Sequence, residues 1–393
     1  SFRILNITDG DVIVDNLTLQ NGNTGGNGGA ILNTATLTVS NSTLTGNQAA
    51  IAGGILSNGA NSELTVTNST ISQNEITSFG GGIVIAVGTA TIENSTIASN
   101  VGGQTAGMQI QSGATVDIIN STIADNGTSG VYGGLIVNSS DTTVTLTNST
   151  VSGNVAGSGM VLITNSAVLN LNNSILANGN GGSDCTNNGG TVNFSTGTSN
   201  LIESNSSGFS CGTAGTNFIE ADPELSTLAD NGGNVQTLLP ADTSPVINAG
   251  DNASALDASG SPLTTDARGE SRFIGTVDLG AVELPQIATI EFTAADTSGA
   301  ESTANPLILT LTTTDGAATE AAFTVTLAVT PGTATLTDDY TFNTSFMVPA
   351  GTASGTPFAI PNTDFAVVDD TRYEPDETLT LALSSPSSGA VLG

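Results

Sequence analysis

The sequence contains no histidine, no lysine and no tryptophan, and it has only four arginines among 393 residues. Against these stand 35 acidic residues, which leave a net charge of −31 at pH 7. Nucleic acids and anionic membranes recruit proteins through basic surfaces, so this charge argues against both as partners. Cations are the partners that it favours.

Aromatic residues are also scarce, at 4% of the chain, yet the mean hydropathy is +0.14. The chain therefore has enough valine, isoleucine and leucine to form a core, and it lacks the composition of a disordered tract. No apolar run is long enough to cross a membrane, and no signal peptide is evident before the first strand-like residues. We expect a mature, exported form that is not inserted into a membrane.

Cysteine is nearly absent, with Cys185 and Cys211 as the two copies. These thiols can be bonded to each other, remain free or bind a metal. Two thiols without histidine make a poor zinc site. A disulfide in an exported protein is the interpretation that we favour.

A repeat of about 26 residues organises the first 180 residues. Asn-Ser-Thr or a close variant recurs in steps of 25, 27, 26, 26, 28 and 25 residues, with its asparagine at Asn16, Asn41, Asn68, Asn94, Asn120, Asn148 and Asn173. A glycine in segments such as GGAI and GGIL keeps the same period, at Gly29, Gly54, Gly82, Gly107, Gly134 and Gly159. Two independent markers with one period indicate a solenoid.

Aliphatic and polar residues alternate on both sides of each asparagine, as in TLTVSNSTLTGN over residues 36–47. Alternation with a period of two predicts strands, whereas a helical solenoid would need a 3.6-residue period. Three short strands and three turns per repeat describe a parallel β-helix with aliphatic ladders inside it. Successive coils of such a fold lie about 4.8 Å apart.

The recurring asparagine has two interpretations. Asn-Ser-Thr is an acceptor pattern for N-glycosylation, but asparagine also tolerates the left-handed backbone of a sharp turn and can bond amide to amide in a ladder. We favour the ladder and regard the following Ser-Thr as a by-product of strand alternation. The predicted ladder residues are Asn41, Asn68, Asn94, Asn120 and Asn148. A second column is expected to mark the next turn: Asn47, Asn74, Asn100, Asn126 and Asn154.

Residues 36–176 resemble the repeats of secreted bacterial right-handed β-helix proteins and, more loosely, the GGAI repeats of polymorphic outer-membrane proteins. Residues 183–284 contain ADPELSTLADNGGNVQTLLPADTSPVINAG and TDARGESRFIGTVDLGAVE. This region resembles the tail of the choice-of-anchor Q class of secreted β-helix proteins. The resemblance implies a cap that closes the solenoid, a Cys185–Cys211 disulfide and an extracellular, surface-associated protein.

The cap region also contains a group of opposite charges. We expect a charge-paired clamp within it, formed by Asp266, Arg268, Arg272 and Asp278. A catalytic Arg–Asp site is the alternative, but no histidine or lysine is available to assist such a site.

The last quarter of the chain changes in pattern, because the recurring asparagine stops and strand-like runs such as LILTLTTT and AFTVTLAV alternate with turns. This predicts an antiparallel sandwich. The region resembles a Calx-beta domain through ESTAN, GTATLTDDY, VPAG and DDTRYEPDETLTLALSSPSSG. The family pattern continues past the equivalent of Gly389 with a final strand. Either that strand is lost, which would leave an open sheet edge, or this sequence is one stretch of a longer protein.

The Calx-beta resemblance implies a calcium site. Calcium takes about six to eight oxygen ligands, and clustered carboxylates repel one another until a cation binds. A solvated acidic loop is the alternative. The residues that the resemblance nominates as ligands are Glu301, Asp339, Asp369, Asp370, Glu374 and Glu377.

Taken together, the fold class that we predict is all-β, a right-handed parallel β-helix followed by an antiparallel, Calx-beta-like β-sandwich. The predicted regions are the coils (1–182), their continuation and cap (183–284) and the sandwich (285–393). The predicted function is a non-enzymatic extracellular structural or adhesive surface protein that binds Ca²⁺.

Two other functions remain open. One is the subunit of a self-assembling filament or surface layer, with itself or other surface proteins as partners. The other is a β-helix that binds or degrades polysaccharide. Paired carboxylates or a nearby base would be needed for degradation, whereas the acids of the coils are isolated in sequence. Phe79 and Tyr132 are the only aromatic residues of the coils that offer a sugar platform.

Overall fold

The computed structural model divides into two compact units, Ser1–Leu284 and Pro285–Gly393, and each is described by itself. It describes residues 2–127, 132–155, 157, 159–205, 208–285, 287–295, 298, 307–313, 316, 318–319, 322–369, 375–387 and 389–393. Apart from the short 3-10 helix η1 (Asn252–Ser254), the regular structure in these residues consists of β-strands. None of their helices is long and apolar enough to cross a membrane.

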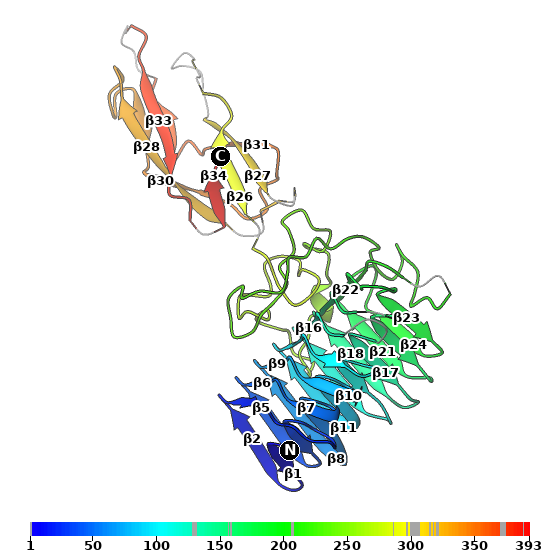
Figure 1. Ribbon diagram of the computed structural model, residues 1–393. Helices are drawn as coiled ribbons and strands as arrows, with labels where there is room; N and C mark the ends of the chain where they lie inside the picture. The colour runs from blue at the N-terminus through cyan, green and yellow to red at the C-terminus, as the bar shows by residue number, and fades with distance from the viewer. Residues whose placement is uncertain are drawn as a thin grey trace. The chain divides into compact units, whose positions relative to one another are not determined.

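The first unit is a parallel β-solenoid, whose coils stack side by side from the blue strands near the N-terminus to the green strands around β23 and β24 (Figure 1). Its coils form because alternate residues of the strands, mostly aliphatic, point into the interior. Like positions of successive coils pair in register, and they build one fully buried ladder from Val66, Ile92, Ile118, Leu146 and Leu171. The predicted interior ladders are confirmed.

Two faces of the solenoid belong to one 14-stranded sheet, because β8 (Ile55–Thr67) and β11 (Ile83–Glu93) run through both faces. The strands of the first face are β1 (Leu5–Ile7), β4 (Ile31–Asn33), β14 (Met108–Ile110), β17 (Leu135–Asn138), β20 (Val161–Thr164) and β23 (Cys185–Asn188). Those of the second face are β2 (Asp11–Asp15), β5 (Thr36–Ser40), β15 (Thr115–Ile119), β18 (Thr143–Thr147), β21 (Val168–Asn172) and β24 (Thr191–Phe194).

The third face is a separate eight-stranded parallel sheet. Its strands are β3 (Thr18–Gln20), β6 (Thr43–Thr45), β9 (Thr70–Ser72), β12 (Thr96–Ala98), β16 (Thr122–Ala124), β19 (Thr150–Ser152), β22 (Ile175–Ala177) and β25 (Leu201–Ile202). A small flanking sheet is formed in the long turns by β7 (Gln48–Ile51), β10 (Glu75–Phe79) and β13 (Val101–Gly102).

The recurring asparagine lies at the sharp turn between the second and third faces. Asn41, Asn68, Asn94, Asn120 and Asn148 all have left-handed backbones, with φ between 45° and 48°. Asparagine tolerates this conformation better than most residues. The predicted turn is confirmed.

The continuous amide ladder lies in the second column, six residues further along each coil, and the prediction that it lies in the first column was wrong. In the second column the Nδ2 of each asparagine up to Asn126 donates to the Oδ1 of the next coil, as from Asn74 to Asn100 at 2.9 Å and from Asn100 to Asn126 at 2.9 Å. Backbone N–H groups donate to the same Oδ1 atoms, and the side chains of the five asparagines in this column are fully buried. The reason for the difference is orientation, because these amides point into the solenoid.

The serine of each Asn-Ser-Thr forms a second buried ladder, and it is not a by-product of strand alternation. The backbone N–H of Ser69 donates to the hydroxyl of Ser95 at 3.2 Å, and Ser95 donates likewise to Ser121 at 3.1 Å. Each hydroxyl in turn donates to a nearby carbonyl, as Ser121 does to Ile119 at 2.8 Å. The tripeptide therefore satisfies the polar groups of a turn inside the fold.

The green end of the solenoid is covered by residues 208–219. Phe218 is fully buried there and packs against Phe194, with ring centroids 6.0 Å apart. The predicted disulfide between Cys185 and Cys211 is present and joins this cover to β23. Both cysteines belong to the main core. After residue 219 the chain leaves the end and runs along the flank (Figure 1).

The second unit consists mainly of antiparallel strands around one apolar core that includes Ile290, Val325 and Tyr340. One sheet contains β31 (Pro357–Ala359), β27 (Ile308–Thr313), β26 (Ala288–Phe292) and β34 (Ala390–Leu392). Another contains β30 (Ser345–Val348), β28 (Phe323–Pro331) and β33 (Leu379–Ser384), and a third pairs β29 (Tyr340–Phe342) with β32 (Phe365–Val367). The predicted antiparallel sheet region is present.

Candidate functional site

Residues 220–284, which we call the strap, lie against the third face and the adjoining turns of the solenoid. The strap has almost no regular structure, and apolar side chains attach it. Val246 and Leu279 share a buried cluster with Ile175, and Leu263 shares another with Ile119. Of the region 183–284 predicted as the cap, residues 208–219 cover the end of the solenoid and the strap covers its flank.

The strap is also held by the recurring asparagines of the first column. Three side-chain amides donate to its carbonyls: Asn120 to Thr265 at 2.7 Å, Asn148 to Asp278 at 3.3 Å and Asn173 to Asp251 at 3.0 Å. These asparagines are buried, whereas Asn41, outside the strap, is exposed. The asparagines of the glycosylation pattern that lie under the strap are therefore inaccessible to glycosylation in the folded protein.

The centre of the strap is a buried cluster of charges around Arg272, whose side chain is fully buried. Its Nη1 lies 3.3 Å from Oε2 of Glu283. Its Nη2 donates to Oδ1 of Asn120 at 2.7 Å and to the carbonyl of Gly280 at 3.0 Å. The bond to Asn120 crosses 152 positions in sequence and joins the strap to a coil.

The other predicted members of the clamp lie in the same cluster. The Nε of Arg268 is 2.9 Å from Asp266, whose Oδ2 also accepts the N–H of Glu283 at 3.0 Å. The carboxylate of Asp278 accepts two backbone N–H groups at 2.7 and 2.8 Å. Glu283 is the member that sequence reasoning missed, because only the fold turns the end of the strap back onto Arg272.

Burial dominates the electrostatics of this cluster. Burial and the nearby charge of Asp278 raise the pKa of Glu283 to about 8, against the opposing effect of Arg272. Burial likewise lowers the pKa of Arg272, although a guanidinium stays charged at neutral pH. The two guanidinium groups and the hydrogen bonds of the cluster compensate the burial of its acidic side chains.

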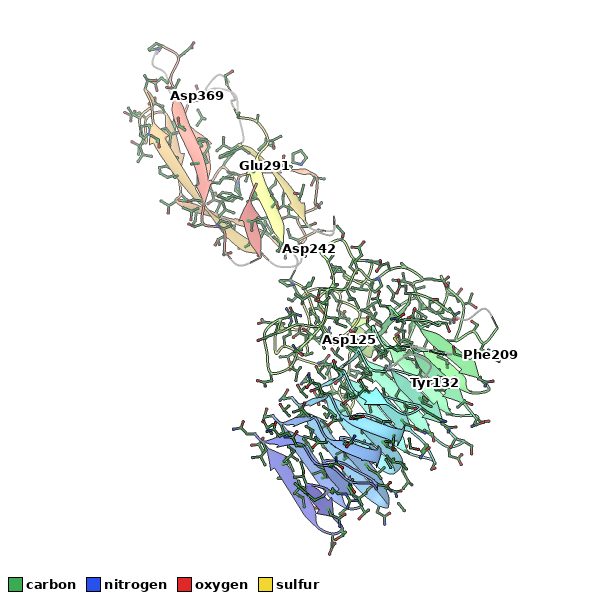
Figure 2. All side chains as sticks on the ribbon, viewed as in Figure 1. Asp125, Tyr132, Phe209, Asp242, Glu291 and Asp369 are labelled. Carbon is green, nitrogen blue, oxygen red and sulfur yellow. A yellow bond between two sulfur atoms is a disulfide. The ribbon has the colours of Figure 1, made fainter. Side chains whose placement is uncertain are left out.

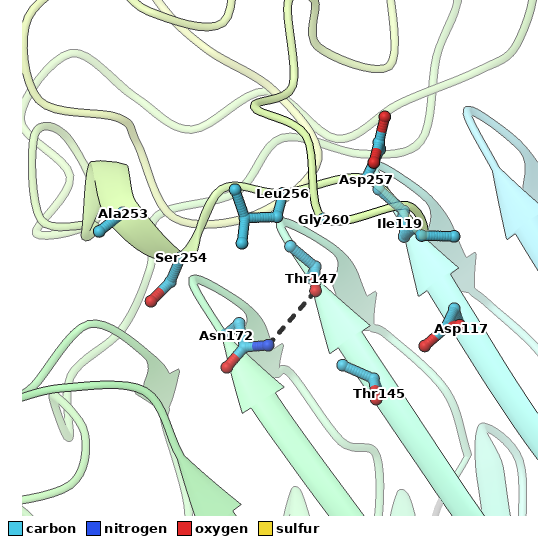
Figure 3. Close-up of a pocket in the computed structure, with 11 residues that line it drawn as sticks. Asp117, Ile119, Thr145, Thr147, Asn172, Ala253, Ser254, Leu256, Asp257 and Gly260 are labelled. Carbon is cyan, nitrogen blue, oxygen red and sulfur yellow. Dashed lines mark hydrogen bonds between the residues drawn. The ribbon is translucent and has the colours of Figure 1, made fainter.

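A groove of about 330 Å³ lies where one loop of the strap meets the second face of the solenoid (Figure 3). Asp117, Thr145 and Asn172 rise from three neighbouring strands, β15, β18 and β21, and form its floor. Residues 253–260 of the strap, with Leu256 among them, form its wall. The Nδ2 of Asn172 donates to the hydroxyl of Thr147 at 3.4 Å (Figure 3).

Three carboxylates are associated with this groove. Burial raises the pKa of Asp117, while a hydrogen bond from Thr145 acts in the opposite direction. Burial, followed by the charge of Asp257, raises the pKa of Glu93 on the neighbouring strand. Asp257 comes from the strap and itself has a lowered pKa, because Ser259 donates to its carboxylate. The sequence suggested isolated acids in the coils because nothing in it places Asp257 beside them.

The first face of the solenoid carries aliphatic side chains on its outer side. Its outward-facing side chains include Leu56, Val84 and Ile136, which are buried under the long turns. Of the two aromatic residues proposed as a sugar platform, Tyr132 is half-buried and the Phe79 side chain lies outside the described part. Aliphatic packing therefore covers this face around Leu56 and Val84.

Three of the six residues nominated for calcium lie outside the described residues: Glu301, Asp370 and Glu374. Of the other three, Asp369 lies next to Val368, whose N–H donates to the carbonyl of Asp339 at 2.9 Å, so these two aspartates belong to neighbouring segments of the second unit. Asp369 lies near the upper end of β33 in Figure 2, and Glu377 lies two residues before the start of that strand. Within the described part of the chain, no group of three or more His, Cys, Asp or Glu side chains is arranged to hold a metal.

Comparison with known proteins supports the first unit. Residues 53–222 match the family model described as a right handed beta helix region. This match and the stacked parallel coils identify the unit as a right-handed parallel β-helix. No curated protein matches the chain, and no solved structure matches it.

Proposed function

We propose that the protein is a non-enzymatic structural component of an extracellular surface, with the strapped β-helix as a rigid stalk. The observation that carries the proposal is the pair of buried ladders, because asparagine and serine side chains link every coil to the next through the interior. Bending the stalk or opening a coil would break several of these hydrogen bonds. The buried polar groups would then lack partners, which costs free energy. The disulfide and the buried Arg272 cluster support the same role.

Pulling the full chain from its two ends tests the stalk. We expect two cooperative unfolding events, with the β-helix opening at the higher force, because its ladders and strap must break together. Single-molecule force spectroscopy measures this. Gradual opening of the coils at forces below that of the second unit would contradict the role, as would release of reducing or unsaturated sugars from acidic polysaccharides.

The second unit is proposed to be a Calx-beta-like module that Ca²⁺ stiffens. Support comes from Asp339 and Asp369, whose segments are joined by the hydrogen bond from Val368 to the carbonyl of Asp339 at 2.9 Å. The Oδ2 of Asp339 accepts the hydroxyl of Thr335 at 2.8 Å, so this carboxylate is already oriented by the fold. Calcium would bind to such carboxylates and offset their repulsion.

Adding Ca²⁺ at millimolar concentration is expected to raise the melting temperature of the second unit by about 5 °C, given the weak affinity of extracellular calcium modules. Calorimetry of the full chain resolves the two units. The same concentration of Mg²⁺ is the control, because Mg²⁺ demands a tighter octahedral site. An unchanged melting temperature with Ca²⁺ would refute the calcium proposal and leave the stalk proposal standing.

A further inference from the structure

The groove beside the strap has a mixed lining. Its floor offers the hydroxyls of Thr145 and Thr147, the amide of Asn172 and the carboxylate of Asp117 (Figure 3). Its wall adds the apolar side chain of Leu256. A volume of about 330 Å³ suits one small ligand, since it lies at the low end of the range for small-molecule sites.

The charge of the groove is not balanced by any cation among the described residues of the first unit. The chain has no lysine or histidine. Arg3 donates to the carbonyls of Asn27 and Gly28, and Arg268 and Arg272 belong to the buried cluster of the strap.

Asp257 is held in an ionised state at the rim of the groove. Its Oδ1 accepts hydrogen bonds from the N–H and the hydroxyl of Ser259 at 2.8 and 2.7 Å, and from the N–H of Ser261 at 2.9 Å. On the floor, Asp117 pairs in register with Thr145 of the next strand. Asp117 therefore presents a carboxylate on the floor, and Asp257 adds negative charge at the rim (Figure 3).

We propose that this groove binds an amino sugar, a ligand that combines a protonated amine with ring hydroxyls. The amine would lie against Asp117, with the negative charge of Asp257 at the rim, and would supply the positive charge that the protein lacks here. The ring hydroxyls would bond to Thr145, Thr147 and Asn172, which can both donate and accept. The apolar face of the ring would pack on Leu256.

The groove lies on the second face of the solenoid and exists only because the strap forms its wall. The first face, which the long turns close with Leu56 and Val84, does not contribute to it. The proposal is independent of the stalk role, because a stalk needs no ligand in this groove. Failure of one therefore leaves the other unaffected.

Titration of the full chain with a glucosamine disaccharide and with its N-acetylated counterpart tests the proposal. The two sugars share the ring hydroxyls and differ in the amine, so the comparison isolates the charge. At physiological salt we expect the glucosamine disaccharide to bind about tenfold more tightly or better. Calorimetric titration or NMR shift mapping measures both affinities. Equal affinities, or no binding of either sugar, would overturn the proposal.

Two variants locate the binding. Asp117→Asn keeps the shape of the floor and is expected to weaken glucosamine binding about tenfold. Glu63→Gln is the matched control, because it removes one charge from the same face at an exposed position outside the groove lining. It is expected to change the affinity by less than about twofold. Equal losses in the two variants would mean non-specific attraction to the acidic surface, and the groove would then be refuted as the site.

Discussion

Replacement of Asn100 by glycine is expected to lower the free energy of unfolding of the β-helix by about 4 kcal/mol. The buried side chain donates to the carbonyl of Ile71 at 3.0 Å and to Asn126 at 2.9 Å. It also accepts both the backbone N–H and the Nδ2 of Asn74, at 3.0 and 2.9 Å. The variant leaves these partners unsatisfied in the interior, and denaturant unfolding measures the loss.

Asn94→Gly is the matched control for this prediction. Asn94 belongs to the same coil, but its left-handed backbone, with φ of 48°, suits glycine. Its Oδ1 is buried without a hydrogen-bond partner, so truncation removes an unsatisfied atom. We expect a change smaller than about 0.5 kcal/mol. Equal destabilisation by the two variants would show that the second-column ladder has no special role.

Arg272→Met is expected to lower the free energy of unfolding by about 3–5 kcal/mol and to loosen the strap. Methionine retains much of the volume, but it leaves Glu283, Asp278 and the Oδ1 of Asn120 without their buried cation. Chymotrypsin digestion reports on the strap, and thermal unfolding reports on stability. Arg268→Met is the control, with a smaller expected effect, because its side chain is 11% exposed and water can reach it.

The pH dependence of the strap provides a second test of the same cluster. The folded pKa of Glu283, about 8, lies above its unfolded value, so the folded state binds more protons between the two values. Glu283 therefore contributes stability that is fully present below its unfolded pKa of about 4.3 and is lost as the pH rises to about 8. In Glu283→Gln this decline should disappear. An unchanged pH profile in that variant would contradict the assignment.

Much of the first unit could be predicted because its repeat is encoded locally. Alternating aliphatic residues identified strands, and the period identified coils. The two asparagine columns were also visible, but their roles could not be assigned from spacing. Both columns have the same period, and only the side-chain direction decides that Asn100 points inward and Asn94 does not.

The sites were harder to predict, because they depend on contacts between distant segments. Arg272 meets Asn120 across 152 positions, and Asp257 reaches the groove from the strap. The strap has no periodic pattern, so its path along the flank is set by scattered apolar contacts and by hydrogen bonds to turn asparagines. The carboxylates of the second unit were nominated by resemblance, and their role remains a proposal.

The sequence alone determined that this is an all-β chain with parallel coils, an acidic surface and a second region of different strand pattern. These properties follow from composition and from periods of two and about 26 residues, which each coil satisfies with its own side chains. Only the tertiary structure decided which asparagines form the interior ladder, where the strap lies and which carboxylates share a groove. Those features arise from packing between segments far apart in the chain, and no local pattern records such contacts.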